Sequence, residues 1–422
     1  MLYLASCLCV SCRKPDTSDW PEVPQRPQAI VNDGDYSFSD GKISEKVLRN
    51  YLSRAITEAE FLANPVYTTD GYWGTEDDER MLLNVGAKFV GRAIYSWNKE
   101  KFFLESNSSW LDGAKKKIDR MHEQDPDIIF QAAMFETVST AVSQVPIPAW
   151  VFEAFGKTPQ TRNFDFNAIR DENNVFLGQW GSGTCVPDMS REEAQMWFYY
   201  MAVRYMEAGV EAIHCGQVML MASMGDKDNG YAGYRKLFSL IREAAKTKAR
   251  RGTVLLDAHC NGIAIDGQTM FDFASFPMRL KEDTSRPSVM AARLKMGYLD
   301  SIIGKTVAGT TPSGWYTDRL PYLLEFDNFG KSDHPGSPGN DHFVWGYDEI
   351  SWIARVPEDY ASTFVREAVQ YLDEYDPVGY LQMPGCRVAA GAAVSPYRCN
   401  MASDACPSGK NLEATIKSLW TD

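Results

Sequence analysis

The chain has 422 residues, of which 44% are hydrophobic and 23% are charged. This composition excludes a disordered or fibrous protein and is typical of a globular one with a large core. The formal net charge of −13 argues against nucleic acid as the partner, because binding phosphates requires a basic face, and it favours a neutral or cationic ligand.

The first twelve residues are apolar and rich in cysteine. The segment Leu4-Ala5-Ser6-Cys7 resembles the lipobox of bacterial lipoproteins, in which the cysteine is acylated after the signal peptide is removed. No apolar run reaches the roughly 20 residues that span a bilayer. We therefore expect export to the periplasm or the cell surface, with a membrane link only through a lipid anchor on Cys7. The alternative is a terminus that is merely frayed.

The rest of the N-terminal region is polar and rich in proline, and it predicts a linker with no core face. We expect residues 1–44 to be a signal remnant and linker, and residues 45–422 to be one catalytic domain. The later cysteines follow no metal-ligand spacing. Cys215 and Cys260 fall in predicted core strands, where free thiols are common. A disulfide between two of Cys386, Cys399 and Cys406 suits an exported protein, although spacing does not select the pair.

Apolar runs that end in polar residues predict eight strands, at residues 50–58, 88–97, 127–136, 211–217, 252–262, 271–279, 321–330 and 379–385. For the first of these, a helix that begins at Ser44 fits nearly as well. Helical patterns predict helices at residues 75–85, 110–123, 190–206, 231–248, 289–299, 348–374 and 411–419. The third helix would open with a capping box from Ser190 to Glu193. The irregular residues 145–188 predict a lid or binding loop, and residues 302–315 receive no assignment.

Strands that alternate with helices predict parallel pairing, because parallel strands need such crossovers. An open doubly wound sheet would usually carry a glycine-rich phosphate loop after its first strand, and this sequence has none there. The expected fold class is therefore α/β, a (β/α)8 TIM barrel with long βα loops.

In such a barrel the strand tips converge on one face, and several tips here are acidic. Two carboxylates in a pocket with aromatic walls meet the requirement for glycoside hydrolysis, where one protonates the leaving oxygen and the other attacks or activates water. The first choice is Glu325 with Asp257, on strands separated by one neighbour, and Glu136 is the reserve. Asp327 would share the face of Glu325. A strand-end acid is more often a loop cap or an ion-pair partner.

Other strand-tip side chains are candidates for substrate binding, namely Arg54, Glu58, Trp97, His214, Gln217, His259, Arg279, Asp327 and Arg387. Flat rings such as Trp97 suit sugar faces, although they also fill cores. Arg54 and Arg279 could hold the carboxylate of an acidic substrate or pair with the acids of the site. No cofactor is expected.

The predicted barrel, residues 324–328 (Leu-Glu-Phe-Asp-Asn) and the lipobox together resemble the exported, lipid-anchored glycoside hydrolases with which bacteria degrade polysaccharides. The resemblance covers residues 45–420 as architecture and implies a carbohydrate substrate with Glu325 as nucleophile. Common barrel glycosidases carry an Asn-Glu pair after strand four. Here that position reads His214-Cys-Gly-Gln217, so only Glu325 is carried over.

Two alternatives remain at this stage. One is a metal-dependent barrel enzyme, such as a sugar isomerase or hydrolase, with His214, Asp257, His259 and Glu325 as ligands. The other is a noncatalytic glycan-binding barrel. Metal content after purification would indicate the former, and ligand binding without turnover the latter.

Overall fold

The computed structural model describes residues 30–329, 331–390 and 395–421. The expected lipid-anchor position, Cys7, lies outside these residues. In the part of the chain that is described, none of the helices combines the length and apolar character needed to cross a membrane.

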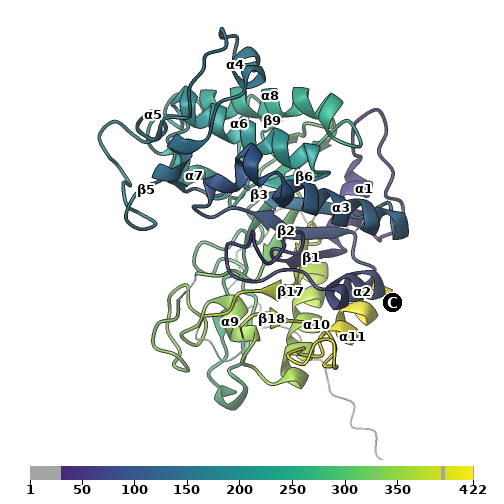
Figure 1. Cartoon of the computed structure of the whole chain (residues 1–422). Helices are drawn as coiled ribbons and strands as arrows, with labels where there is room; N and C mark the ends of the chain where they lie inside the picture. The colour runs from purple at the N-terminus through teal and green to yellow at the C-terminus, as the bar shows by residue number, and fades with distance from the viewer. Residues whose placement is uncertain (1–29, 330, 391–394, 422) are drawn as a thin grey trace, which may run out of the picture.

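The main sheet has seven strands in the order β18-β17-β1-β2-β3-β6-β7, and only β17 and β18 pair in antiparallel fashion. The strands are β1 (Ala55–Glu58), β2 (Phe89–Tyr95), β3 (Ile129–Ala133), β6 (Ala212–His214), β7 (Leu255–Asp257), β17 (Met383–Arg387) and β18 (Tyr397–Arg398). They are almost wholly buried, as parallel strands covered by helices are. Figure 1 shows β1, β2 and β17 across the middle of the molecule.

A second, parallel sheet contains β10 (Ala274–Pro277), β15 (Tyr322–Glu325) and β16 (Gly379–Leu381). At one margin β16 runs into β17 through Gln382, whose N–H donates to the carbonyl of Leu324 at 2.8 Å. At the other margin Ser275 forms a parallel bridge with His259, which follows β7. The N–H of Ser275 donates to the carbonyl of Ala258 at 3.2 Å. Backbone pairings therefore continue from one sheet into the other at both margins. The α/β class with parallel strands is confirmed.

The longer helices are α1 (Glu45–Leu52), α2 (Glu76–Val85), α3 (Ser109–Gln124), α6 (Glu192–Glu207), α8 (Ala232–Lys248), α10 (Glu358–Tyr375) and α11 (Glu413–Thr421). In Figure 1 α6 and α8 lie above the main strands, and α10 and α11 lie below them. Their boundaries follow sequence signals. Thr75 and Asp78 form the capping box that starts α2, and the helix ends at Gly86 as expected. Shorter helices are α4 (Ala149–Ala154), α5 (Phe166–Ile169), α7 (Val218–Ala222) and α9 (Glu349–Ile353).

Small strand pairs occupy the long connections. They are β4 (Val138–Ser139) with β5 (Thr184–Cys185), β11 (Lys281–Glu282) with β12 (Ala292–Arg293), and a sheet of β8 (Ala264–Ile265), β9 (Gln268–Thr269), β13 (Gly309–Thr310) and β14 (Tyr316–Thr317). Single turns of 3-10 helix lie at Glu100–Phe103, Glu105–Asn107, Thr140–Gln144 and Pro287–Val289.

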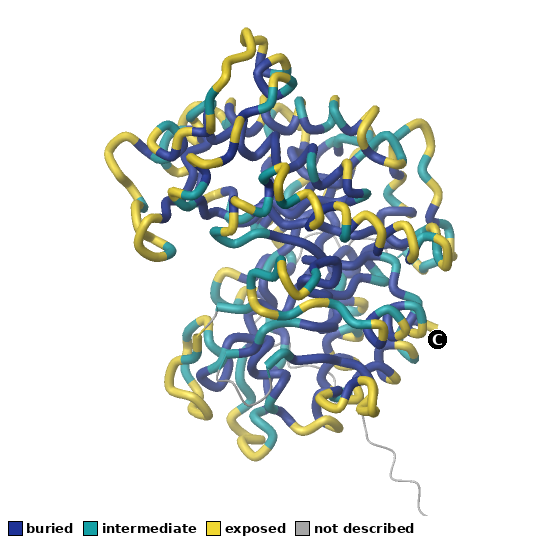
Figure 2. Tube along the Cα trace, viewed as in Figure 1, coloured by how far each residue is buried: buried dark blue, intermediate teal, exposed yellow. Residues whose placement is uncertain are grey.

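The beginnings of the main strands pack into one apolar cluster. It joins side chains of α1 to residues at the amino ends of seven strands, namely Ala55, Phe89, Ile129, Ala212, Leu255, Phe273 and Leu323. Burying each large apolar side chain contributes about 1.5–3 kcal/mol, so α1 stabilises the fold from this end. Figure 2 shows the buried residues concentrated along the strands, with the exposed ones on the outer loops.

The structure corrects five local expectations. The helix predicted from Ser44 forms as α1, so strand one begins only at Ala55. Tyr36 and Ile43 belong to the same apolar cluster, so the linker does have a core face. The helix expected at residues 289–299 is absent, because Met290 adopts a left-handed backbone conformation (φ 47°) and Ala292–Arg293 pairs with Lys281–Glu282 instead.

The other two corrections concern side chains. The capping box at α6 does not form, because the Ser190 hydroxyl donates to Asp188 Oδ1 at 2.7 Å and leaves Arg191 as the N-cap. The disulfide expected in the tail is also absent, and Cys386, Cys399 and Cys406 are free. Cys399 Sγ points at Met81 Sδ, 3.7 Å away, and not at another thiol.

Candidate active site

A cavity of about 970 Å³ opens at the carboxyl ends of the main strands. Its wall is built from residues at or just beyond the ends of β1, β2, β3, β6, β7, β10, β15 and β17, among them Ala59, Trp97, Glu136, Gln217, His259, Arg279, Asp327 and Arg387. These residues come from distant parts of the sequence, as expected where parallel strands end together.

Aromatic rings line one part of this cavity. Trp97 lies edge-to-face with Trp180, with ring centroids 5.5 Å apart, and with Phe135 at 5.3 Å. Trp180 belongs to the irregular residues 145–188, so that insertion reaches the cavity. Its indole N–H donates to the carbonyl of Glu136 at 3.0 Å, which fixes the ring beside that residue. Such rings can stack on a flat apolar ligand face.

Glu136 is the cavity carboxylate with the most closely defined position. Gln217 donates to it twice, from its backbone N–H at 3.0 Å and from its side-chain amide at 2.9 Å. Gly216 is required here, because a Cβ at this position would lie 2.5 Å from Glu136 Oε2 and the backbone has a φ of 59°. The loop after β6 therefore holds the carboxylate that follows β3.

Asp327 is the second carboxylate held at the wall, two residues beyond β15. Its Oδ1 lies 3.5 Å from Arg387 Nη2. The buried carboxyl of Glu349 accepts the N–H groups of Asp327 at 3.0 Å, Met278 at 3.2 Å and Arg279 at 2.7 Å. Burial raises the pKa of Glu349 to about 7. One carboxyl group on α9 thus positions the tips of both β10 and β15.

Below the cavity, polar side chains from the main strands bond to one another across the interior. The layer comprises Thr57, Arg92, Gln131, His214, Asp257, Ser275, Glu325 and Gln382. Gln382 donates to the Thr57 hydroxyl at 2.8 Å. There is room for the Gln382 side chain because residue 91 is a glycine, since a Cβ at Gly91 would lie 2.0 Å from Gln382 Nε2. Buried polar groups that are paired in this way favour one arrangement of the strands.

Glu325 belongs to this layer and is 1% exposed. Arg92 Nη2 donates to its Oε1 at 2.6 Å, Arg387 Nη1 lies 3.3 Å from its Oε2, and His259 Nε2 contacts Oε1. Burial opposes the charged form, but Arg92, His259 and Arg387 together hold the pKa of Glu325 well below its usual range. The carboxylate does not line the cavity, although all three of its partners do.

Asp257 lies in the same layer and is also 1% exposed. It accepts from the Gln131 amide and the Ser275 hydroxyl and pairs with His214 Nδ1, each at 2.7 Å. Burial lowers the pKa of His214 to about 4, so its ring is neutral at pH 7 and Nδ1–H donates to Asp257. Neither Asp257 nor His214 lines the cavity.

The remaining predicted site residues divide into two groups. Those that line the cavity are Trp97, Gln217, His259, Arg279, Asp327 and Arg387, together with the reserve carboxylate Glu136. Two others lie elsewhere. Arg54 precedes β1, at the amino ends of the strands, with its guanidinium over the ring of Trp420. Glu58 is buried with both side-chain oxygens unpaired within the described residues, and burial raises its pKa well above the usual range.

Arg92 is the main site residue that the sequence reasoning missed. A bulge interrupts the register between β2 and β3 after Val90, and Arg92 itself has a φ of 59°. This conformation, which is uncommon for a residue other than glycine, accompanies a side chain aimed across the interior at Glu325. The available signal was Gly91 within an apolar strand, since an isolated strand glycine suggests a bulge.

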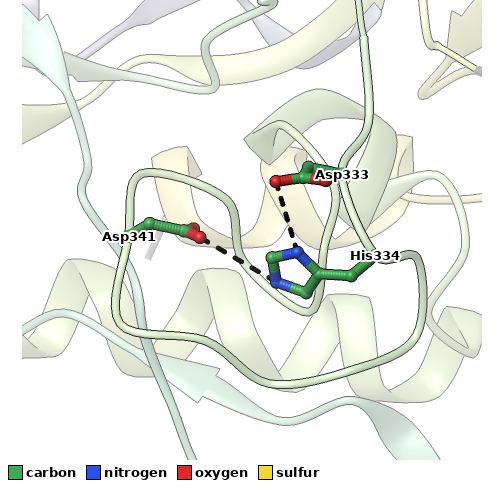
Figure 3. Close-up of side chains that lie close together, drawn as sticks. All are labelled: Asp333, His334 and Asp341. Atoms are coloured by element: carbon green, nitrogen blue, oxygen red, sulfur yellow. Dashed lines mark ion pairs between the residues drawn. The ribbon is translucent and has the colours of Figure 1, made fainter.

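A group of potential metal ligands lies in the loop between β15 and α9. Within the residues that the structure describes, Asp333, His334 and Asp341 bring ligand atoms within 4.8 Å of one another. Figure 3 shows the two carboxylates facing different nitrogens of the His334 ring, Asp333 at 3.4 Å from Nδ1 and Asp341 at 3.9 Å from Nε2. This is the geometry of two ion pairs on one ring, and the group is largely exposed.

No family model and no curated protein sequence matches the chain. Among solved structures, the Nostoc punctiforme debranching enzyme is similar with a TM-score of 0.45 and 10% identity, over 88% of this chain and 80% of that one. The GH20 exo-β-N-acetylglucosaminidase of Vibrio harveyi is similar with a TM-score of 0.41 and 10% identity, over 88% of this chain and 54% of that one. A likeness this low assigns the chain to no family.

Proposed function

We propose that this protein is a glycoside hydrolase with a (β/α)8 barrel fold, and that its reaction takes place in the cavity at the strand ends. Two features support the barrel. Backbone pairings continue between the two sheets at both margins. In addition, the amino ends of seven strands share one apolar cluster, which is how side chains fill the interior of a closed ring.

The observation that carries the proposed activity is the pair of carboxylates Glu136 and Asp327 on the wall of a cavity that also presents Trp97 and Trp180. Glycosidases place two carboxyl groups on either side of the scissile bond. The rings supply surfaces on which a sugar can stack. We assign to Glu136 and Asp327 the roles that the sequence suggested for Glu325 and Asp257.

In this assignment one of the two groups protonates the leaving oxygen, and the other attacks the anomeric carbon or activates water. Glu325 and Asp257 become positioning residues. Glu325 orients Arg92, His259 and Arg387, which reach the cavity, and Asp257 fixes His214 and Ser275 beneath it.

To test the proposal, a panel of oligosaccharides is incubated with the purified protein, with and without a chelator. We expect cleavage that the chelator does not abolish and that Glu136→Gln or Asp327→Asn removes while glycan binding persists. Binding without cleavage of any sugar would favour a glycan-binding barrel, and loss of activity with the chelator would favour the metal-dependent enzyme. Full activity in both variants would overturn the assignment of these carboxylates.

Export with a lipid anchor on Cys7 is part of the same proposal. It is supported by the segment Leu4-Ala5-Ser6-Cys7 and agrees with an enzyme that meets polysaccharides outside the cell.

A further inference from the structure

Two parts of the cavity wall differ in the side chains that they present. One part surrounds the rings of Trp97 and Trp180 and contains Glu136 and Asp70. Asp70 accepts a hydrogen bond from the hydroxyl of Tyr95, which lies beside Phe135. This part of the cavity therefore combines aromatic rings and carboxylates with Arg92 and Arg387, which are paired with the buried Glu325.

The other part, the basic end, is formed by Arg279, Lys305 and Lys331 with Asp300 and His342. Arg279 Nε donates to Asp300 Oδ1 at 2.5 Å, and His342 Nε2 lies 3.7 Å from the same oxygen. Lys331 Nζ lies 5.9 Å from the centroid of the Phe343 ring. Arg279 is thus paired with Asp300, and Lys305 and Lys331 bring two further permanent cations to this end.

Two of the three permanent cations of the basic end, Lys305 and Lys331, are not neutralised by a carboxylate of the described residues. Neither Lys305 nor Lys331 forms an ion pair with a carboxylate of the described residues, and both side chains are exposed. Arg279 is 8% exposed and lies over the rings of Phe276 and Phe329, at 5.1 and 5.7 Å from their centroids. Its Nη1 is buried and has no hydrogen-bond partner among the described residues. An anionic group that entered this end would supply the kind of acceptor that is missing.

From the two lysines without an ion pair and the unpartnered Arg279 Nη1 we propose that the glycan bound here carries an anionic substituent, a carboxylate or a sulfate, which the basic end binds. The inference rests on the proposed glycoside hydrolase function and names its substrate class. The net charge of −13 favoured a neutral or cationic ligand, but exposed charges farther away than about 10 Å are largely screened at 0.1 M salt, so the local cations decide.

The test compares binding of four sets of short oligosaccharides by calorimetry. These are oligouronides, the same oligouronides after carboxyl reduction, sulfated oligosaccharides, and the same sugars after desulfation. We expect one of the anionic sets to bind more tightly than its neutral counterpart, and the set that does so identifies the group as carboxylate or sulfate. Added salt should weaken that binding.

The double variant Lys305→Ala/Lys331→Ala should weaken binding of the preferred anionic set by roughly 3- to 30-fold, as expected for two exposed charge contacts. Binding of the neutral counterpart should not change. Replacement of both lysines by arginine should preserve the preference for the anionic set. Lys116→Ala, which removes an exposed lysine of α3 away from the cavity, is the matched control and should have no effect.

Equal affinity for the anionic and neutral sets, or an equal loss in Lys116→Ala, would overturn the inference. Its failure is distinct from failure of the proposed function. Cleavage of neutral glycans alone would leave the hydrolase in place and refute the anionic substrate. Lysine-dependent binding of an anionic glycan that is never cleaved would support the basic end and refute the hydrolase.

Discussion

Arg92 and Glu325 form a buried, two-point ion pair between β2 and β15. Arg92 donates from Nη2 to Oε1 at 2.6 Å and from Nε to Oε2 at 3.3 Å, and both side chains are almost fully buried. The two strands belong to different sheets, so the pair connects distant parts of the chain beneath the cavity.

Replacing one partner of this ion pair should lower the free energy of unfolding. Arg92→Met leaves the Glu325 carboxylate buried with weaker compensation, and we expect the free energy of unfolding at pH 7 to fall by about 3 kcal/mol, as measured by urea denaturation. Arg92→Met/Glu325→Leu removes both charges and should recover part of that loss. A single variant as stable as the wild type would show that His259 and Arg387 suffice to hold the carboxylate.

The next prediction concerns catalysis by the cavity carboxylates Glu136 and Asp327. Glu136→Gln and Asp327→Asn should each lower kcat by at least about 100-fold, because acid–base and nucleophilic groups contribute that much or more. Thermal unfolding should show that both variants remain folded. Glu123→Gln, a change at an exposed position of α3, provides the control and should retain wild-type kcat. A larger effect of Asp257→Asn or Glu325→Gln on kcat alone, with folding intact, would return the catalytic role to the buried pair.

Trp180 should act mainly through substrate binding. Trp180→Ala should raise KM by roughly 2- to 12-fold, the range expected when an aromatic contact is lost, with a smaller change in kcat. Trp180→Phe keeps a ring but loses the N–H that donates to Glu136, so it separates stacking from positioning. The exposed Trp73, which is not part of the cavity wall, is a suitable control as Trp73→Ala.

The raised pKa of Glu349 predicts that the free energy of unfolding depends on pH. Its pKa is about 7 in the folded protein and about 4.3 in an unfolded chain, so between these values the folded state binds the proton more strongly. Stability from this group is therefore fully present below about pH 4 and declines as pH rises towards 7, by up to about 3 kcal/mol. Urea unfolding from pH 5 to 8 should show a steeper decline for the wild type than for Glu349→Gln. Parallel curves for the two proteins would contradict this origin.

The proposed lipid anchor on Cys7 can be tested by metabolic labelling. The full chain, expressed in a bacterium in the presence of labelled palmitate, should incorporate label and fractionate with membranes. Cys7→Ser should abolish both, whereas Cys9→Ser should leave both unchanged. Label that is retained in Cys7→Ser would refute acylation at this residue.

The pattern of apolar runs predicted the core of the main strands other than β18, because strands that are buried on both faces read as continuous hydrophobic segments. It failed where local propensity and tertiary pairing disagree. Residues 289–299 have helical composition, yet Ala292–Arg293 pairs with Lys281–Glu282, and no local signal indicates that pairing. Similarly, Ser190 and Glu193 match a capping box, but Asp188 takes the serine hydroxyl.

The sequence predicted that the site residues lie near strand ends, but it did not predict how deeply each side chain is buried. Sequence places Glu325 and Asp327 near one strand tip. It does not indicate that the first is the last residue of β15, inside the polar layer, whereas the second has passed the strand end and reached the wall. Arg92, which lies at the bulge in β2, pairs with Glu325 in the interior. Trp180 arrives from an insertion whose path depends on tertiary contacts.

The hydrogen-bonded side chains beneath the cavity close it from below, since Gln131, Asp257, Arg92 and Glu325 fill the interior between the strands. If the proposed reaction takes place at Glu136, the released sugar has no exit through the centre of the molecule and leaves by the face through which the next glycan enters. The product and the next substrate would then compete for the same opening of the cavity, so slow release of the product would limit the turnover rate.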